Sequence, residues 1–68
     1  MMTPEDFKAI RLKLGATAVE WGRALGFRGK NIRLTVDRME IGHSKYPISE
    51  RTAGRARALE RRFDAAWA

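Results

Sequence analysis

Apolar residues in this chain recur three and four positions apart, which is the spacing of one face of an α-helix. The longest such run comes near the end of the sequence, at Ala53, Ala56, Leu59, Phe63 and Trp67. No segment sustains the alternation of apolar and polar residues that a half-buried β-strand requires. A chain of 68 residues has enough interior for a single hydrophobic core. The sequence therefore predicts one all-α domain over residues 1–68, a compact bundle of four to five helices.

Capping residues and glycines divide the chain into four expected helices, at residues 4–14, 17 to about 25, about 30–41 and about 49–67,. Thr17 and Glu20 form a capping box, in which a hydroxyl and a carboxylate satisfy free amides at the start of a helix. Gly26 ends the second helix, because glycine readily takes the left-handed conformation that closes a helix. Asn31 is the expected N-cap of the third helix.

Gly22 breaks the helical pattern of the second segment, since glycine inside a helix costs roughly 1 kcal/mol relative to alanine. It belongs to the expected inner face of that helix, with Ala18, Trp21 and Leu25. A neighbouring helix that crosses close to this backbone would leave no room for a side chain. We therefore expect the second and third helices to pack tightly against each other at Gly22.

The positive charge of the chain is concentrated in its middle. Lysine and arginine number 14 against eight acidic residues, a formal net charge of +6, and residues 23–45 carry six of the bases and two of the acids. In the third helix, Ile32, Val36 and Met39 form an apolar face, and the opposite face presents Lys30, Arg33, Leu34, Asp37 and Arg38. This distribution favours a polyanionic partner, nucleic acid before a membrane.

A helix, a glycine turn and a basic helix follow one another here with the spacing of a helix-turn-helix. In that arrangement the first helix crosses the DNA backbone, and the second lies in the major groove, which is wide enough to admit an α-helix. Spacing and charge together predict a nucleic-acid-binding unit with its recognition helix at about 30–41,.

Three motifs in this order resemble the XRE class of helix-turn-helix proteins, the phage repressor and Cro-like group: IRLKLG at 10–15, TAVEWGRALG at 17–26 and MEIG at 39–42, with a proline at position 47. The resemblance implies a λ-repressor-like fold that binds operator DNA, usually as a two-fold dimer. The chain departs from the family pattern at Ala18, where glutamine is usual, and at Met39, where tryptophan is common. The segment FRGKNIRL at 27–34 is also about four residues longer than the family's turn and recognition-helix start,.

The resemblance further implies a partly buried ion pair between Arg11, late in the first helix, and Glu40, at the end of the recognition helix. A partly buried arginine needs a bidentate acceptor to offset its desolvation, and Glu40 would supply one. The alternative is that these are two unrelated surface charges.

The expected DNA contacts lie at the start and along the outer face of the third helix, at Arg28, Lys30, Asn31, Arg33 and Arg38, with Thr17 and Lys45 expected on phosphates. Arginine reads guanine through two hydrogen bonds, asparagine can read adenine, and lysine mainly supplies charge. Leu34 is expected either to meet a thymine methyl group or to pack against the turn. Phe63 and Trp67 are expected to cap the core, with a dimer contact as the alternative.

These expectations together describe a sequence-specific DNA-binding regulator, a repressor or autorepressor of an inverted-repeat operator in a phage or mobile element. We expect a cytoplasmic homodimer that binds double-stranded DNA and needs no membrane, small-molecule ligand, metal or cofactor. Two alternatives stay open: a protein-interaction module, such as an antitoxin that holds a partner protein, and a small basic RNA-binding protein. An enzyme is not expected, because the sequence has no cysteine, a single histidine, His43, and no phosphate-cradling loop.

Overall fold

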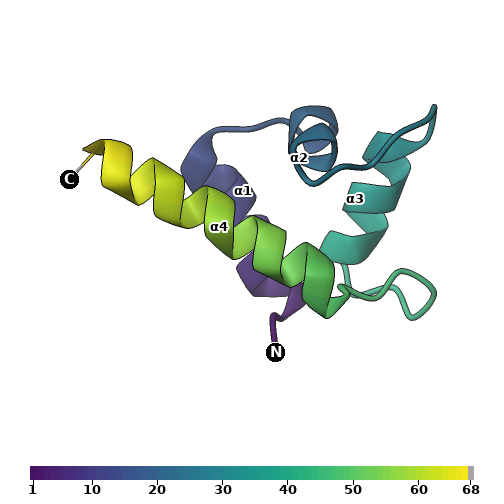
Figure 1. Ribbon diagram of the computed structural model, residues 1–68. Coiled ribbons are helices and arrows are strands. Elements are labelled where there is room, and N and C mark those ends of the chain that lie inside the picture. The colour runs from purple at the N-terminus through teal and green to yellow at the C-terminus, as the bar shows by residue number, and fades with distance from the viewer. Residues whose placement is uncertain (68) are drawn as a thin grey trace.

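The computed structural model describes residues 1–67, which form four α-helices and no strand (Figure 1). The helices are α1 (Pro4–Leu14), α2 (Ala18–Ala24), α3 (Ile32–Glu40) and α4 (Glu50–Trp67). The prediction of an all-α chain is confirmed for these residues, with the smaller of the two expected numbers of helices. None of the helices in residues 1–67 combines the length and the apolar composition that a membrane-spanning segment needs.

Two helix pairs make up the molecule. α4 runs along α1, whereas α2 and α3 pack on each other more extensively than any other two helices (Figure 1). An ion pair from Lys13 to Asp64, with a distance of 2.8 Å between Nζ and Oδ1, joins α1 to the C-terminal half of α4. Beyond this point, the end of α4 extends past the other three helices (Figure 1). The globular part of the fold is therefore built around α1, α2, α3 and the first half of α4.

The hydrophobic core lies where these elements meet. Its buried apolar residues are Met2, Phe7, Ile10, Trp21, Leu25, Ile32, Val36, Met39 and Ala56. The rings of Phe7 and Trp21 are tilted against each other with centroids 5.5 Å apart, and they join α1 to α2. The predicted apolar face of α3 is buried over its whole length. This burial fixes which side of α3 is left for solvent.

Gly22 lies where α2 and α3 cross. A Cβ atom built at this position would collide with Cγ2 of Ile32 and would lie 3.1 Å from Cγ2 of Val36. The close crossing expected from the sequence is therefore present, and it explains why glycine occupies a buried helical position. The energy that glycine loses in helix propensity is offset by the packing of two α3 side chains against bare backbone.

The start of α2 has the predicted capping box. The hydroxyl of Thr17 accepts a hydrogen bond from the amide of Glu20 at 3.1 Å, and the carboxylate of Glu20 accepts one from the amide of Thr17 at 2.9 Å. Asn31 holds the N-cap position of α3, but its side chain makes no capping hydrogen bond. The predicted N-cap position is therefore confirmed, although the side chain of Asn31 does not contribute to the cap.

Trp67 does not cap the core, so that prediction is wrong. Its side chain is 78% exposed, and its ring contacts Phe63, with a distance of 6.0 Å between centroids. The two residues do continue the apolar stripe of α4. The stripe continues beyond the core, however, because α1 ends at Leu14, one residue after the Lys13 that pairs with Asp64, and no other helix covers the end of α4 (Figure 1).

Candidate nucleic-acid interface

The burial of one side of α3 exposes the other. We use the name outer face of α3 for Arg33, Leu34, Asp37 and Arg38, together with Ile41, which follows the last helical residue. The side chain of Arg33 is 80% exposed. Leu34 is 43% exposed and so is not packed beneath the turn. The outer face thus combines two guanidinium groups with two exposed apolar side chains.

Arg33 and Asp37 lie one helical turn apart on this face. Their Nε and Oδ2 atoms are 3.8 Å apart, and the side chain of Asp37 is 53% exposed. A solvated pair at this spacing contributes only a few tenths of a kcal/mol, about 0.3–0.5. Asp37 therefore orients the guanidinium of Arg33 without immobilising this side chain. A stronger acceptor can replace Asp37 as the partner of Arg33.

Arg38 leads from the outer face to the connector between α3 and α4. Its guanidinium lies over the ring of Tyr46, 5.3 Å from the centroid. Tyr46 in turn meets the ring of His43 edge-on at 5.3 Å, and the amide of Lys45 donates to Nδ1 of His43 at 3.1 Å. These contacts hold the connector beside α3. They place the exposed Lys45 next to the end of the outer face.

Thr17 lies beside the outer face of α3, next to Arg33 and Asp37. Together with Arg11, Ala18, Val19, Arg33 and Asp37 it lines an open hollow of about 510 Å³ between the start of α2 and α3. Hydrogen bonds from the amide and hydroxyl of Thr17 lower the pKa of Glu20, so the carboxylate stays charged and keeps the start of α2 in place. Thr17 and Arg33 are thus brought together by the fold.

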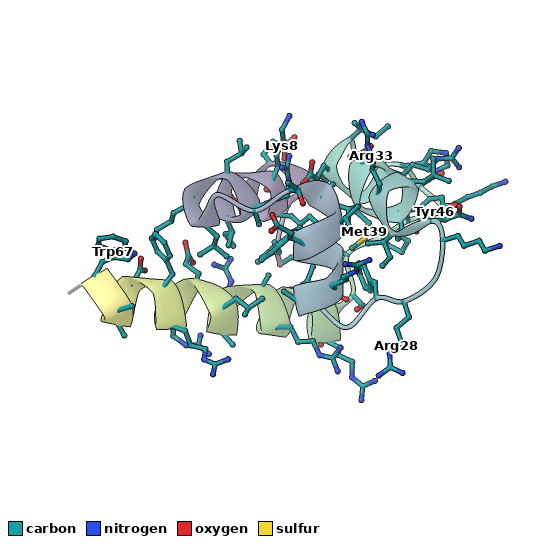
Figure 2. All side chains as sticks on the ribbon, turned by 90° about the horizontal axis from the view of Figure 1, so that it is seen from above. Lys8, Arg28, Arg33, Met39, Tyr46 and Trp67 are labelled. Atoms are coloured by element: carbon teal, nitrogen blue, oxygen red, sulfur yellow. The ribbon has the colours of Figure 1, made fainter. Side chains whose placement is uncertain are left out.

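The turn between α2 and α3 carries the other predicted contacts, Arg28, Lys30 and Asn31, all of which are exposed. Arg28 and Arg33 point to different sides of the α2–α3 unit (Figure 2). The predicted residues therefore do not form a single cluster. Thr17 and Arg33 share one hollow, Arg38 and Lys45 lie at the connector, and Arg28 lies apart.

Arg11 and Glu40 form the ion pair that the family resemblance implies. Nε of Arg11 lies 2.6 Å from Oε2 of Glu40, and Nη2 donates to Oε1 at 3.1 Å. A third guanidinium nitrogen, Nη1, donates to the carbonyl of Ala16 at 3.1 Å. The hydrogen bond with Glu40 raises the pKa of Arg11. The pair fixes the C-terminal end of α3 against α1 and so sets the direction of the outer face.

Sequence reasoning missed two residues that shape this region. Tyr46 stacks under Arg38, and Arg55 of α4 donates from Nη1 to the carbonyl of Leu25 at 2.7 Å, at the end of α2. A lone aromatic residue in a proline-containing connector was the available signal for Tyr46. Nothing in the sequence pairs Arg55 with Leu25, since they belong to helices that the turn and connector bring together.

The side chains of the candidate interface act through charge and hydrogen bonding. Its side chains are mostly guanidinium, ammonium, amide and hydroxyl groups, which are the donors that proteins direct at phosphates and base edges. Among residues 1–67 no group of three or more His, Cys, Asp or Glu residues is arranged to hold a metal ion. Comparisons with protein-family models, with curated protein sequences and with solved structures found no significant match to this chain.

Proposed function

We propose that this chain is a sequence-specific DNA-binding regulator in which α2 and α3 act as a helix-turn-helix. The observation that carries the proposal is the orientation of α3: its apolar stripe packs on α2 at Gly22, while Arg33 is exposed on the opposite side and the half-buried Arg38 lies beside it over Tyr46. The major groove of B-DNA, about 12 Å wide, admits a helix presented in this way. The family resemblance of the motifs supports the same function and a λ-repressor-like fold.

In this proposal different residues of the outer face of α3 contact different bases. Recognition helices contact bases mainly through their N-terminal residues. Arg33 therefore donates two hydrogen bonds to a guanine, and Leu34 contacts a thymine methyl group. Lys30 and Asn31 lie just before them and reach the same groove. Asp37 braces Arg33 in the free protein.

Residues beside the outer face bind the DNA backbone. Thr17 at the start of α2 and Lys45 in the connector contact phosphates on either side of α3. Arg38, stacked on Tyr46, lies between the groove and the connector, where its guanidinium serves either a base edge or a phosphate. Contacts to phosphate fix the position of the protein on the duplex without carrying sequence information.

The active species in this proposal is a homodimer joined through the end of α4. Half-buried Phe63 and exposed Trp67 form an aromatic pair on the side of α4 that elsewhere packs on the core. A second copy related by a two-fold axis would place the same residues against each other, as a self-complementary interface requires. Two outer faces of α3 would then read the halves of an inverted repeat, and occupation of such a site at a promoter would repress transcription.

An apolar hollow favours a second candidate function, a module that holds a partner protein. The hollow measures about 620 Å³ and lies between the N-terminus, the connector and the start of α4, with Met2, Tyr46 and Ile48 among its lining residues. A protein partner could occupy it. We rank this function second, because the positive charge of the chain does not gather at that hollow.

Selection of binding sites from a pool of random duplexes tests the proposal. We expect an enriched inverted repeat, bound roughly 10³-fold or more tightly than random DNA at physiological salt. A single-stranded RNA pool, selected in parallel, tests the RNA-binding alternative. Failure to enrich any duplex sequence would contradict sequence-specific recognition.

A further inference from the structure

A second basic surface lies at the turn between α2 and α3, away from the outer face of α3. An open hollow of about 420 Å³ is lined there by Arg23, Gly26, Phe27, Arg28, Gly29 and Ile32. Both arginines are exposed, and no acidic residue lines the hollow. Gly29 has no atom within 4 Å of the position that a Cβ would take, so the backbone here is open to an approaching group.

Arg55 adds a third guanidinium to this surface. Its Nη1 donates to the carbonyl of Leu25 at 2.7 Å and lies against Gly26, where a Cβ would meet it. Gly26 takes a left-handed φ of 93°, and the missing side chain lets the guanidinium approach. We use the name turn patch for Arg23, Arg28 and Arg55.

The side chains of Arg23 and Arg28 are not held by an ion pair within residues 1–67. Carbonyls at the end of α2 already have backbone partners: Gly26 donates to Arg23 at 3.0 Å and Phe27 donates to Gly22 at 2.9 Å. Arg23 and Arg28 line one hollow without an acidic neighbour, and a bound anion would offset the repulsion between like charges there,.

We propose that the turn patch binds phosphates of duplex DNA on the side of the groove opposite Thr17. This inference rests on the proposed function, since it takes α3 to lie in the groove. A helix in the major groove has one phosphate backbone on each side. Thr17 lines the hollow beside Arg33, and Arg28 points to a different side of the α2–α3 unit from Arg33 (Figure 2). We place Arg28, in the extended turn, at the second of these backbones.

The salt dependence of binding tests the turn patch. The double variant Arg23→Gln/Arg28→Gln is compared with the control Arg61→Gln/Arg62→Gln, which makes the same change in net charge on exposed residues near the far end of α4. Each phosphate contact contributes about 0.9 to the slope of log K against log salt concentration. We expect the slope to become shallower by about 2 for the turn-patch variant and to stay unchanged for the control. The single variant Arg28→Gln should give about half the effect.

The preference for the selected site over random DNA should survive in the turn-patch variant, because phosphate contacts carry no sequence information. A slope equal to that of the control would overturn the inference, and so would a loss of site preference without a change of slope. Both slopes are also measured with a random-sequence duplex. If the unmodified protein shows no site preference, the proposed base reading fails, while the slopes on random duplex still decide whether the turn patch binds phosphate. Absence of binding to any duplex would contradict both proposals.

Discussion

Arg11 and Glu40 connect α1 to the last residue of α3 through two hydrogen bonds, of 2.6 Å from Nε to Oε2 and 3.1 Å from Nη2 to Oε1. Their side chains are only 16% and 6% exposed. A partly buried ion pair adds little net stability to a fold. Removal of one partner is costly, however, because the other charge then stays buried without compensation. The pair therefore acts as a fixed joint that sets the angle of α3.

Removal of Glu40 should destabilise the fold. In Glu40→Ala the guanidinium of Arg11 stays partly buried without its bidentate acceptor, and we expect the free energy of unfolding to fall by about 2–3 kcal/mol. Urea denaturation followed by circular dichroism measures the change. The matched control is Asp37→Ala, which breaks the exposed pair with Arg33 and should shift stability by less than about 0.5 kcal/mol. Equal effects of the two variants would show that Arg11–Glu40 is not a structural joint.

Gly22 and Gly54 should respond to alanine in opposite directions. At Gly22 the new methyl group collides with Ile32 in the core, so overpacking of about 1–3 kcal/mol outweighs the gain in helix propensity,. At Gly54, inside α4, nothing lies within 4 Å of the new atom. Gly54→Ala should therefore stabilise the protein by about 0.5–1 kcal/mol. Melting temperatures of the two variants test the α2–α3 crossing, and a stabilising Gly22→Ala would contradict it.

The local features of the fold were predictable from the sequence. Capping residues, such as Thr17 with Glu20, and the apolar spacing of α3 act over a few positions, so helix bounds and buried faces follow from them. Gly22 is a similar case, because a glycine in the middle of a helix indicates a close neighbour. The placement of the helices relative to one another was harder to predict from the sequence. The exposure of Trp67 depends on where α1 ends relative to α4, which no local pattern encodes.

The candidate site was predictable only in part, for the same reason. Arg33 belongs to a regular helix, and its direction follows from the burial of Ile32 and Val36. The direction of Arg28 depends on the path of an extended turn, which the sequence does not specify. Arg23 was not among the expected contacts, since it precedes the turn by several residues and only the fold brings it beside Arg28.

The capping box of α2 should make stability depend on pH. Hydrogen bonds from Thr17 lower the pKa of Glu20 below its usual 4.5. Its contribution to stability is therefore present above pH 4.5 and is lost as the pH falls through the lowered pKa, because the unfolded chain binds the proton more readily,. Glu20→Gln keeps a hydrogen-bond acceptor without a titrating group. The stability advantage of the unmodified protein over this variant should shrink on acidification, and a difference independent of pH would contradict the assignment.

Truncation of Trp67 tests the proposed dimer. Trp67→Ala removes an exposed ring, so the stability of the isolated chain should change by less than about 0.5 kcal/mol. Association should weaken, and sedimentation velocity over a range of concentrations measures it. Leu12→Ala is the control, since Leu12 is another exposed apolar residue that the proposal leaves outside the interface. If the unmodified protein sediments as a monomer at every concentration, the proposed α4 interface is wrong.

The central claim is that the solvent-facing side of α3 reads DNA bases, and the most direct test is a ratio of two dissociation constants. Binding to a duplex with the selected site and to a random duplex of equal length is measured at one salt concentration for the unmodified protein, Arg33→Ala and Arg61→Ala. We expect a preference of roughly 10³-fold or more in the unmodified protein. Arg33→Ala should reduce it by about tenfold or more without lowering the melting temperature, and Arg61→Ala should leave it unchanged. Identical ratios in the two variants would contradict base reading by α3.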